Sequence, residues 1–276
     1  MLKLIKNNFK TTNDCIILAT PLIIFLSILG WYLNYALDSI DNIPKLILAV
    51  VTTLVMSSGF FSAWFYMTKK TLKLAKTVFI FDKDRAKAFR ELILSLPKGI
   101  GKLFLPFLGI ISISGIIFGI VVLLTTIFVT KYIGTIDIGL FNSENVLIST
   151  NELINEIKDL SNNELIVLNC WYLILTSLST ILSFIAMLWI PEVVYTETNP
   201  FRALIQAIKK LFITLPKSFL LFLYVNVLMI CVSVLNTLLM YNPILYFFVL
   251  VLYYYLFVYI VVLIFTYYEQ TFLYEQ

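Results

Sequence analysis

Six apolar runs, each about 20 residues or longer, leave this chain few folds to adopt. They cover residues 15–37, 46–67, 103–129, 165–190, 218–240 and 244–266. A helix needs about 20 apolar residues to cross a hydrocarbon core about 30 Å thick. Backbone groups in lipid must be paired within the segment, so each run is expected to be helical. The sequence predicts an all-α polytopic membrane protein in which residues 1–276 form a single integral membrane domain.

The first run follows a lysine-bearing start that is typical of a secretory signal. It spans about 23 residues, however, which is longer than the apolar core of a signal peptide. It also contains the bulky Trp31 and Tyr32. We therefore expect a retained first membrane span.

Basic residues gather on alternate sides of the predicted spans, which gives an orientation. Of the 20 Lys and Arg residues, only Lys45, Lys131 and Lys158 fall outside the N-terminal segment and the linkers 68–102 and 191–217. Cytoplasmic segments of membrane proteins are enriched in Lys and Arg. The pattern predicts that both termini and both linkers are cytoplasmic. The loop 130–164 is then extracytoplasmic, and Ser149–Glu152 in it matches a helix capping box.

Both cytoplasmic linkers carry amphipathic helix patterns. In residues 84–96, apolar side chains recur at helical spacing and the charged ones lie off that stripe. Such a helix either lies on an anionic membrane surface or packs under the helix bundle. The second linker starts a helix at Asn199-Pro200, a favourable cap and first-turn pair. Both linkers end in Leu-Pro-Lys, which favours a threefold repeat of a basic approach helix and a two-span hairpin.

These features together resemble a known group of proteins. The hairpins, the Pro191-Glu192 pair and the sequence from Asn199 to Ala203 before the second linker helix are similar to prokaryotic six-span membrane proteins. That group is poorly characterised and includes the membrane domain attached to some glycerophosphodiester phosphodiesterases. The resemblance implies a multi-pass protein of the prokaryotic cytoplasmic (inner) membrane. It does not imply phosphodiesterase activity, because the chain has no such domain.

Residue content argues against most catalytic chemistry. The chain has no histidine, which excludes Ser-His-Asp catalysis and the commonest zinc sites. The cysteines Cys15, Cys170 and Cys231 are far apart in sequence, so neither a disulfide framework nor a metal cluster is expected. We therefore expect no catalytic residues, no metal, no cofactor and no nucleic-acid partner.

Charged residues avoid the middle of every predicted span. Asp14, Glu192 and Glu269 lie near span ends on the predicted cytoplasmic side. Ordinary interfacial salt bridges are one interpretation of these acids. The other is a binding site for a lipid headgroup or a partner, framed by Glu192, Arg90 and Arg202.

A few polar side chains lie within the predicted spans. The candidates are Asn226, Asn236, Tyr255 and Tyr259, and the last two are four residues apart and can share a helix face. They are expected either to form hydrogen bonds between helices or to line a polar cavity. Gly115 and Gly119 form a GxxxG pattern that allows close helix approach. The tryptophans lie toward span ends, as in an interfacial aromatic belt: Trp31, Trp64, Trp171 and Trp189.

The sequence favours a non-enzymatic membrane protein that acts as a binding, assembly or lipid-interacting module. Its expected partners are membrane lipids and, as a further candidate, another membrane or cytoplasmic protein. The alternative is a transporter or permease-like protein with a cavity lined by the fourth to sixth spans.

Overall fold

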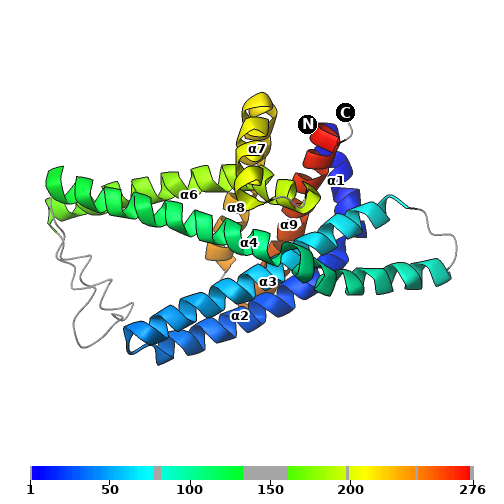
Figure 1. The fold of residues 1–276 in the computed structure, drawn as a ribbon, viewed down its shortest axis with the longest axis horizontal. Coiled ribbons are helices and arrows are strands. Elements are labelled where there is room, and N and C mark those ends of the chain that lie inside the picture. Colours follow the sequence, from blue (N-terminus) through cyan, green and yellow to red (C-terminus); the bar gives the residue numbers. More distant parts are fainter. Residues whose placement is uncertain (1, 78–81, 133–160, 197–198, 240–241, 274–276) are drawn as a thin grey trace. The chain divides into compact units, whose positions relative to one another are not determined.

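A computed structural model describes residues 2–77, 82–132, 161–196, 199–239 and 242–273. The described residues are almost entirely helical (Figure 1). The N-terminal part contains α1 (Leu2–Asp14), the short 3-10 turn η1 (Ile16–Leu18), α2 (Ala19–Ser39), α3 (Ile43–Ala75) and α4 (Asp82–Tyr132). The C-terminal part contains α6 (Asn162–Thr196), α7 (Pro200–Ile213), α8 (Leu215–Leu239), α9 (Pro243–Tyr268) and the terminal π-helical turn η2 (Glu269–Leu273).

Six of the helical segments are long and apolar enough to cross a membrane, as predicted. In five of them only 17% of the most apolar window is buried by the protein itself. Large side chains such as Trp31, Ile43 and Leu105 are more than 70% exposed. This much exposed apolar surface requires an apolar surrounding. The chain is therefore a helical membrane protein with six candidate spans.

The chain divides into two compact units. The first comprises Met1–Leu29, Met56–Gly109 and Phe184–Gln276, and the second comprises Gly30–Val55 and Ile110–Ser183. The first unit contains most of the buried side chains, and the interactions described below lie within it unless stated otherwise.

Two tryptophans belong to the core of the first unit and not to an interfacial belt. Trp64 is fully buried and its indole Nε1 donates to the carbonyl oxygen of Leu18 at 2.8 Å. Trp189 is 1% exposed and its Nε1 donates to the carbonyl oxygen of Pro200 at 2.9 Å. The aromatic-belt expectation is wrong for these two residues because each indole N–H has a protein partner. Trp31 is 72% exposed, as a belt residue would be.

The two Leu-Pro-Lys sequences adopt different local structures. In the first, Pro97 lies inside the continuous helix α4, so the linker helix runs into the third span without a break. In the second, α7 ends at Ile213 and Pro216 lies in the first turn of α8. Proline is well tolerated in a first turn, where the missing N–H has no intrahelical partner. The helix pattern at 84–96 and the third span at 103–129 are thus parts of one helix, and the repeat remains a prediction.

Close helix approach occurs at other glycines than the GxxxG pair. A Cβ added at Gly99 of α4 would lie 2.8 Å from Cβ of Tyr66 and 2.9 Å from Cα of Ala63, both on α3. In contrast, a Cβ added at Gly115 or Gly119 meets no atom within 4 Å in the described part of the chain. The tight crossing of α3 and α4 at Gly99 is therefore a contact that requires a glycine. Gly109 is another, because a Cβ added there would lie 2.5 Å from Cγ of Pro200.

Helix starts follow the expected capping chemistry. Asn199 caps α7, and its side-chain oxygen accepts from the N–H of Phe201 at 3.0 Å, which confirms that prediction. At the start of α6, in the second unit, the Glu164 carboxylate accepts from both the N–H and the hydroxyl of Ser161, an arrangement that was not predicted. The capping box predicted at Ser149–Glu152 lies outside the described residues.

Candidate functional site

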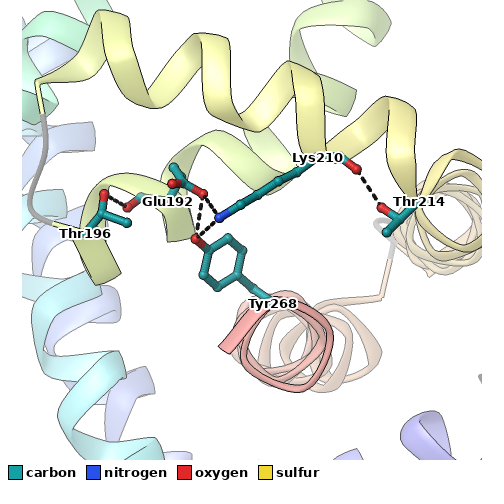
Figure 2. Close-up of polar contacts among 5 residues, drawn as sticks. All are labelled: Glu192, Thr196, Lys210, Thr214 and Tyr268. Atoms are coloured by element: carbon teal, nitrogen blue, oxygen red, sulfur yellow. Dashed lines mark hydrogen bonds and ion pairs between the residues drawn. The ribbon is translucent and has the colours of Figure 1, made fainter. Parts of the chain in front are cut away.

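The main polar feature of the first unit is a cluster of two buried glutamates, each bound by one lysine and one tyrosine. We call it the carboxylate clamp. Its members come from the turn after α3 and from α6, α7, α9 and η2. They are Lys76, Glu192, Tyr195, Lys210, Tyr268 and Glu269. Figure 2 shows the half of the clamp that surrounds Glu192.

Glu192 joins α6 to α7 and α9. Its carboxylate is 1% exposed, and Oε2 accepts from the ammonium of Lys210 and the hydroxyl of Tyr268, both at 2.5 Å. The Lys210 ammonium also donates to the Tyr268 hydroxyl oxygen at 2.8 Å and lies 4.8 Å from the centre of the Tyr268 ring. In Figure 2 the Lys210 side chain extends from α7 to reach both partners.

Glu269 has the same two kinds of partner. Its side chain is 8% exposed and forms an ion pair with Lys76, just beyond the end of α3. Its Oε1 accepts from the hydroxyl of Tyr195 on α6 at 2.7 Å. The rings of Tyr195 and Tyr268 stack with centroids 5.4 Å apart, so the two halves of the clamp are in contact.

A lysine from α3 binds a carbonyl group at the C-terminal end of α6. Lys69 donates to the carbonyl oxygen of Val194 at 2.9 Å, and its ammonium lies 5.3 Å from the Tyr195 ring centre. The last carbonyls of a helix lack intrahelical partners, and a cation is favourable there. The helix therefore continues past Pro191 to Thr196, whereas the sequence predicted its end at Ile190. Glu192 is consequently part of the fourth helix and not of a linker.

The clamp connects helices through its two buried carboxylates. A buried carboxylate is costly unless it is paired and hydrogen-bonded. Glu192 and Glu269 each have an ammonium and a phenol as donors, so each is both paired and hydrogen-bonded. Buried ion pairs add little net stability, but they define which partners must meet. We infer that the ion pairs and hydrogen bonds of the clamp hold the ends of α3, α6 and α9 together with α7.

Of the predicted headgroup site, only Glu192 is part of the clamp. Arg90 on α4 and Arg202 on α7 are exposed, and neither has an ion-pair partner among the described residues. The cation that binds Glu192 is Lys210. The structure therefore does not bring the three predicted residues together.

The predicted mid-membrane residues have separate partners. Asn226 donates to the carbonyl oxygen of Phe222 on its own helix at 2.8 Å. Tyr255 donates to Asn13 of α1 at 2.9 Å, and the Tyr259 hydroxyl lies 3.1 Å from that of Tyr224 on α8. Tyr255 and Tyr259 thus connect α9 to two different helices, as the interhelical hydrogen-bond interpretation expects.

Asn236 is exposed and lies one turn before the end of α8, so it is not near the middle of the span. It lines a cavity of about 330 Å³ between α8 and α9. The remaining lining residues also come only from these two helices: Met229, Val232, Ser233, Tyr246, Val249, Leu250 and Tyr253. In the part of the chain that is described, no residue of α6 lines this cavity.

Five of the six clamp residues were not predicted as site residues. Glu269 was identified only as an acid near a span end, and the sequence contains a signal for two of the others. The fourth and sixth spans both end with tyrosine close to glutamate: Tyr195 three residues after Glu192, and Tyr268 directly before Glu269. This similarity was visible in the sequence. The identity of the lysine partners was not, because Lys76 is 193 residues from Glu269.

Comparison of the chain with family models, curated proteins and solved structures finds no match. The resemblance to the membrane domain of glycerophosphodiester phosphodiesterases therefore stays a hypothesis. Among the described residues, no group of three or more Cys, Asp or Glu side chains could hold a metal ion.

Proposed function

We propose that this chain is a non-enzymatic integral membrane protein that acts as a binding, assembly or lipid-interacting module. The observation that carries the proposal is the carboxylate clamp. It occupies both buried glutamates and joins helix ends, while neighbouring cations remain exposed. Glu192 and Glu269 each accept from a lysine ammonium and a tyrosine hydroxyl, which favours a supporting role over acid–base chemistry.

The proposed orientation places the clamp on the cytoplasmic side of a prokaryotic inner membrane. The N-terminal segment and both basic linkers then face the negatively charged leaflet. Exposed cations near such a surface attract anionic headgroups, each contributing about 1 kcal/mol at most. Arg90 and Arg202, which have no ion-pair partner among the described residues, are proposed to act in this way.

We expect that the double change Arg90→Gln and Arg202→Gln weakens phosphatidylglycerol binding by purified protein roughly fivefold at low salt. Binding to phosphatidylcholine should not change. The effect should disappear at high salt, because attraction at an exposed surface is screened. Native mass spectrometry of lipid titrations measures both. The charge-matched control is Lys45→Gln and Lys131→Gln, two exposed lysines on the predicted extracytoplasmic side, which should leave phosphatidylglycerol binding nearly unchanged. Unchanged phosphatidylglycerol binding at low salt would refute this role for the two arginines.

The alternative, a transporter or permease-like protein, has one observation in its favour. The cavity of about 330 Å³ between α8 and α9 is large enough for a small ligand and contains the polar groups of Ser233, Asn236 and Tyr246. Its lining from two helices differs from the three-helix cavity that the sequence suggested.

Accessibility at position 226 distinguishes the two functions. Asn226 is partly buried at the middle of α8 and bonded to its own helix. In a variant without the native cysteines, Asn226→Cys should be at least tenfold less reactive toward a membrane-impermeant thiol reagent than Asp41→Cys, which lies in an exposed loop of the second unit. Equal reaction rates at the two positions would support a water-filled pathway and overturn the supporting role.

A further inference from the structure

A second cavity, distinct from the clamp, lies between the end of α3 and the first part of α4. Its volume is about 320 Å³. Three lysines line it, together with one acid and several apolar or small side chains. We call it the lysine groove; Lys70, Lys73 and Lys98 line it beside Tyr66, Glu91 and Leu92.

The crossing at Gly99 shapes this groove. There, α4 lies so close to Ala63 and Tyr66 that an added Cβ would fall within 3 Å of both. Away from this point the two helices diverge, with Lys70 and Lys73 on α3 facing the cavity from one side and Lys98 and Glu91 on α4 from the other. The helix crossing at Gly99 therefore closes one end of the groove, and charged side chains line the rest of it.

The charge in the groove is only partly balanced by the residues that the structure describes. Lys70, Lys73 and Lys98 are exposed, and none has an ion-pair partner among the described residues. Glu91 offsets one of the three charges. Ammonium groups gathered around one cavity repel each other unless an anion is bound, and lysine is a common ligand for phosphate.

The groove also has apolar surface, which matches an amphiphilic anion. Leu92 in its wall is 8% exposed, and Leu94 is 46% exposed. On the same helix Phe89 and Ile93 are about half exposed, at 52% and 51%. A ligand with a phosphate next to hydrocarbon chains can place the phosphate among the lysines and the chains along this surface.

The position of the groove relative to the hydrocarbon core fits a lipid headgroup. Helix α3 has 33 residues, which corresponds to a length of about 50 Å at 1.5 Å per residue. This exceeds the hydrocarbon thickness of about 30 Å, so the helix must extend into the headgroup layer or beyond. Lys70 and Lys73 are in its charged last turns, after the apolar segment that ends near Met67.

We infer that the lysine groove binds the phosphate of an anionic phospholipid. This inference rests on the proposed lipid-interacting function and specifies its ligand class and site. Lys70, Lys73 and Lys98 bind the phosphate. The glycerol backbone lies against the part of the wall that Tyr66 and Leu92 form.

The test uses the full-length protein in neutral detergent, titrated with phosphatidylglycerol, phosphatidylcholine or inorganic phosphate and followed by native mass spectrometry. The triple change Lys70→Gln, Lys73→Gln and Lys98→Gln should weaken phosphatidylglycerol binding by roughly tenfold or more. Triple replacement of the same residues by arginine should retain binding. The charge-matched control is Lys6→Gln, Lys10→Gln and Lys209→Gln, three exposed lysines outside the groove. Because these lysines share no cavity, their replacement should weaken binding clearly less than the groove substitutions do.

The outcomes separate the inference from the function on which it rests. Suppose that the wild type prefers phosphatidylglycerol. If the groove and control variants then lose this binding to the same extent, or if neither variant loses it, the groove is not the site, although the lipid-interacting function stands. If the wild type shows no preference for phosphatidylglycerol and no phosphate binding, both fail. If inorganic phosphate displaces the lipid at comparable concentration and only the groove variant loses phosphate binding, the site is supported with a free anion as its ligand. Thermal unfolding of each variant shows that folding is retained, as expected for exposed lysines.

Discussion

Replacing Glu192 by leucine is expected to destabilise the protein by about 2–3 kcal/mol. Removing one partner of a buried ion pair leaves the other charge unpaired, which costs about 3–5 kcal/mol when burial is complete. The Lys210 side chain is 25% exposed and can turn its ammonium partly toward solvent, so we expect a smaller value. Equilibrium unfolding in mixed micelles, followed by circular dichroism, measures the change.

Two controls show whether the effect belongs to the clamp. The double change Glu192→Leu and Lys210→Met removes both charges and should be less destabilising than Glu192→Leu alone. Asp41→Asn removes an exposed pair in the second unit, where Lys45 donates to Asp41 at 2.7 Å and this hydrogen bond lowers the pKa of the Asp41 carboxyl. Exposed pairs of this kind add little to stability because solvent screens them, so this variant should be nearly as stable as the wild type. If Glu192→Leu were equally harmless, the clamp would not hold these helix ends together.

Replacing Gly99 by alanine is expected to destabilise the protein by about 1–3 kcal/mol, because a side chain cannot fit at the helix crossing. Its Cβ would lie 2.9 Å from the Ser62 carbonyl oxygen and equally close to Cα of Ala63, and backbone atoms cannot turn aside. The helices must move apart, which outweighs the gain of about 0.5–1 kcal/mol that alanine brings to a helix interior. The same unfolding experiment measures the result.

Gly101 provides the matched control two residues away on the same helix. A Cβ added there meets no atom within 4 Å in the described structure. Gly101→Ala should therefore raise stability by up to about 1 kcal/mol through helix propensity alone. Similar effects of the two substitutions would show that the crossing at Gly99 is looser than described.

The helical content was predictable because length and hydropathy act locally. Any segment of about 20 apolar residues in lipid has to satisfy its own backbone, whatever its neighbours are. The cap at Asn199 was predictable for a similar reason, since its partner, the N–H of Phe201, is two residues away. The continuity of α4 was not, because proline within a helix is compatible with either a break or a tolerated interruption.

The candidate sites were harder to predict because their parts come from distant segments. Glu192 was recognised as a polar residue near a span end, but its partners Lys210 and Tyr268 are 18 and 76 residues away. Arg90 and Arg202 seemed equally suitable by charge. The selection of Lys210 depends on which face α7 turns toward α6.

The helical character and the six segments able to span a membrane follow from runs of adjacent residues, so both could be predicted from the sequence. Which glycine lies at a helix crossing, which tryptophans are buried and which lysines bind glutamate became known from the three-dimensional fold. Those choices depend on distances between helices that are far apart in the chain. The clamp and the lysine groove both arise in this way, from helix ends that the sequence describes only as basic or acidic.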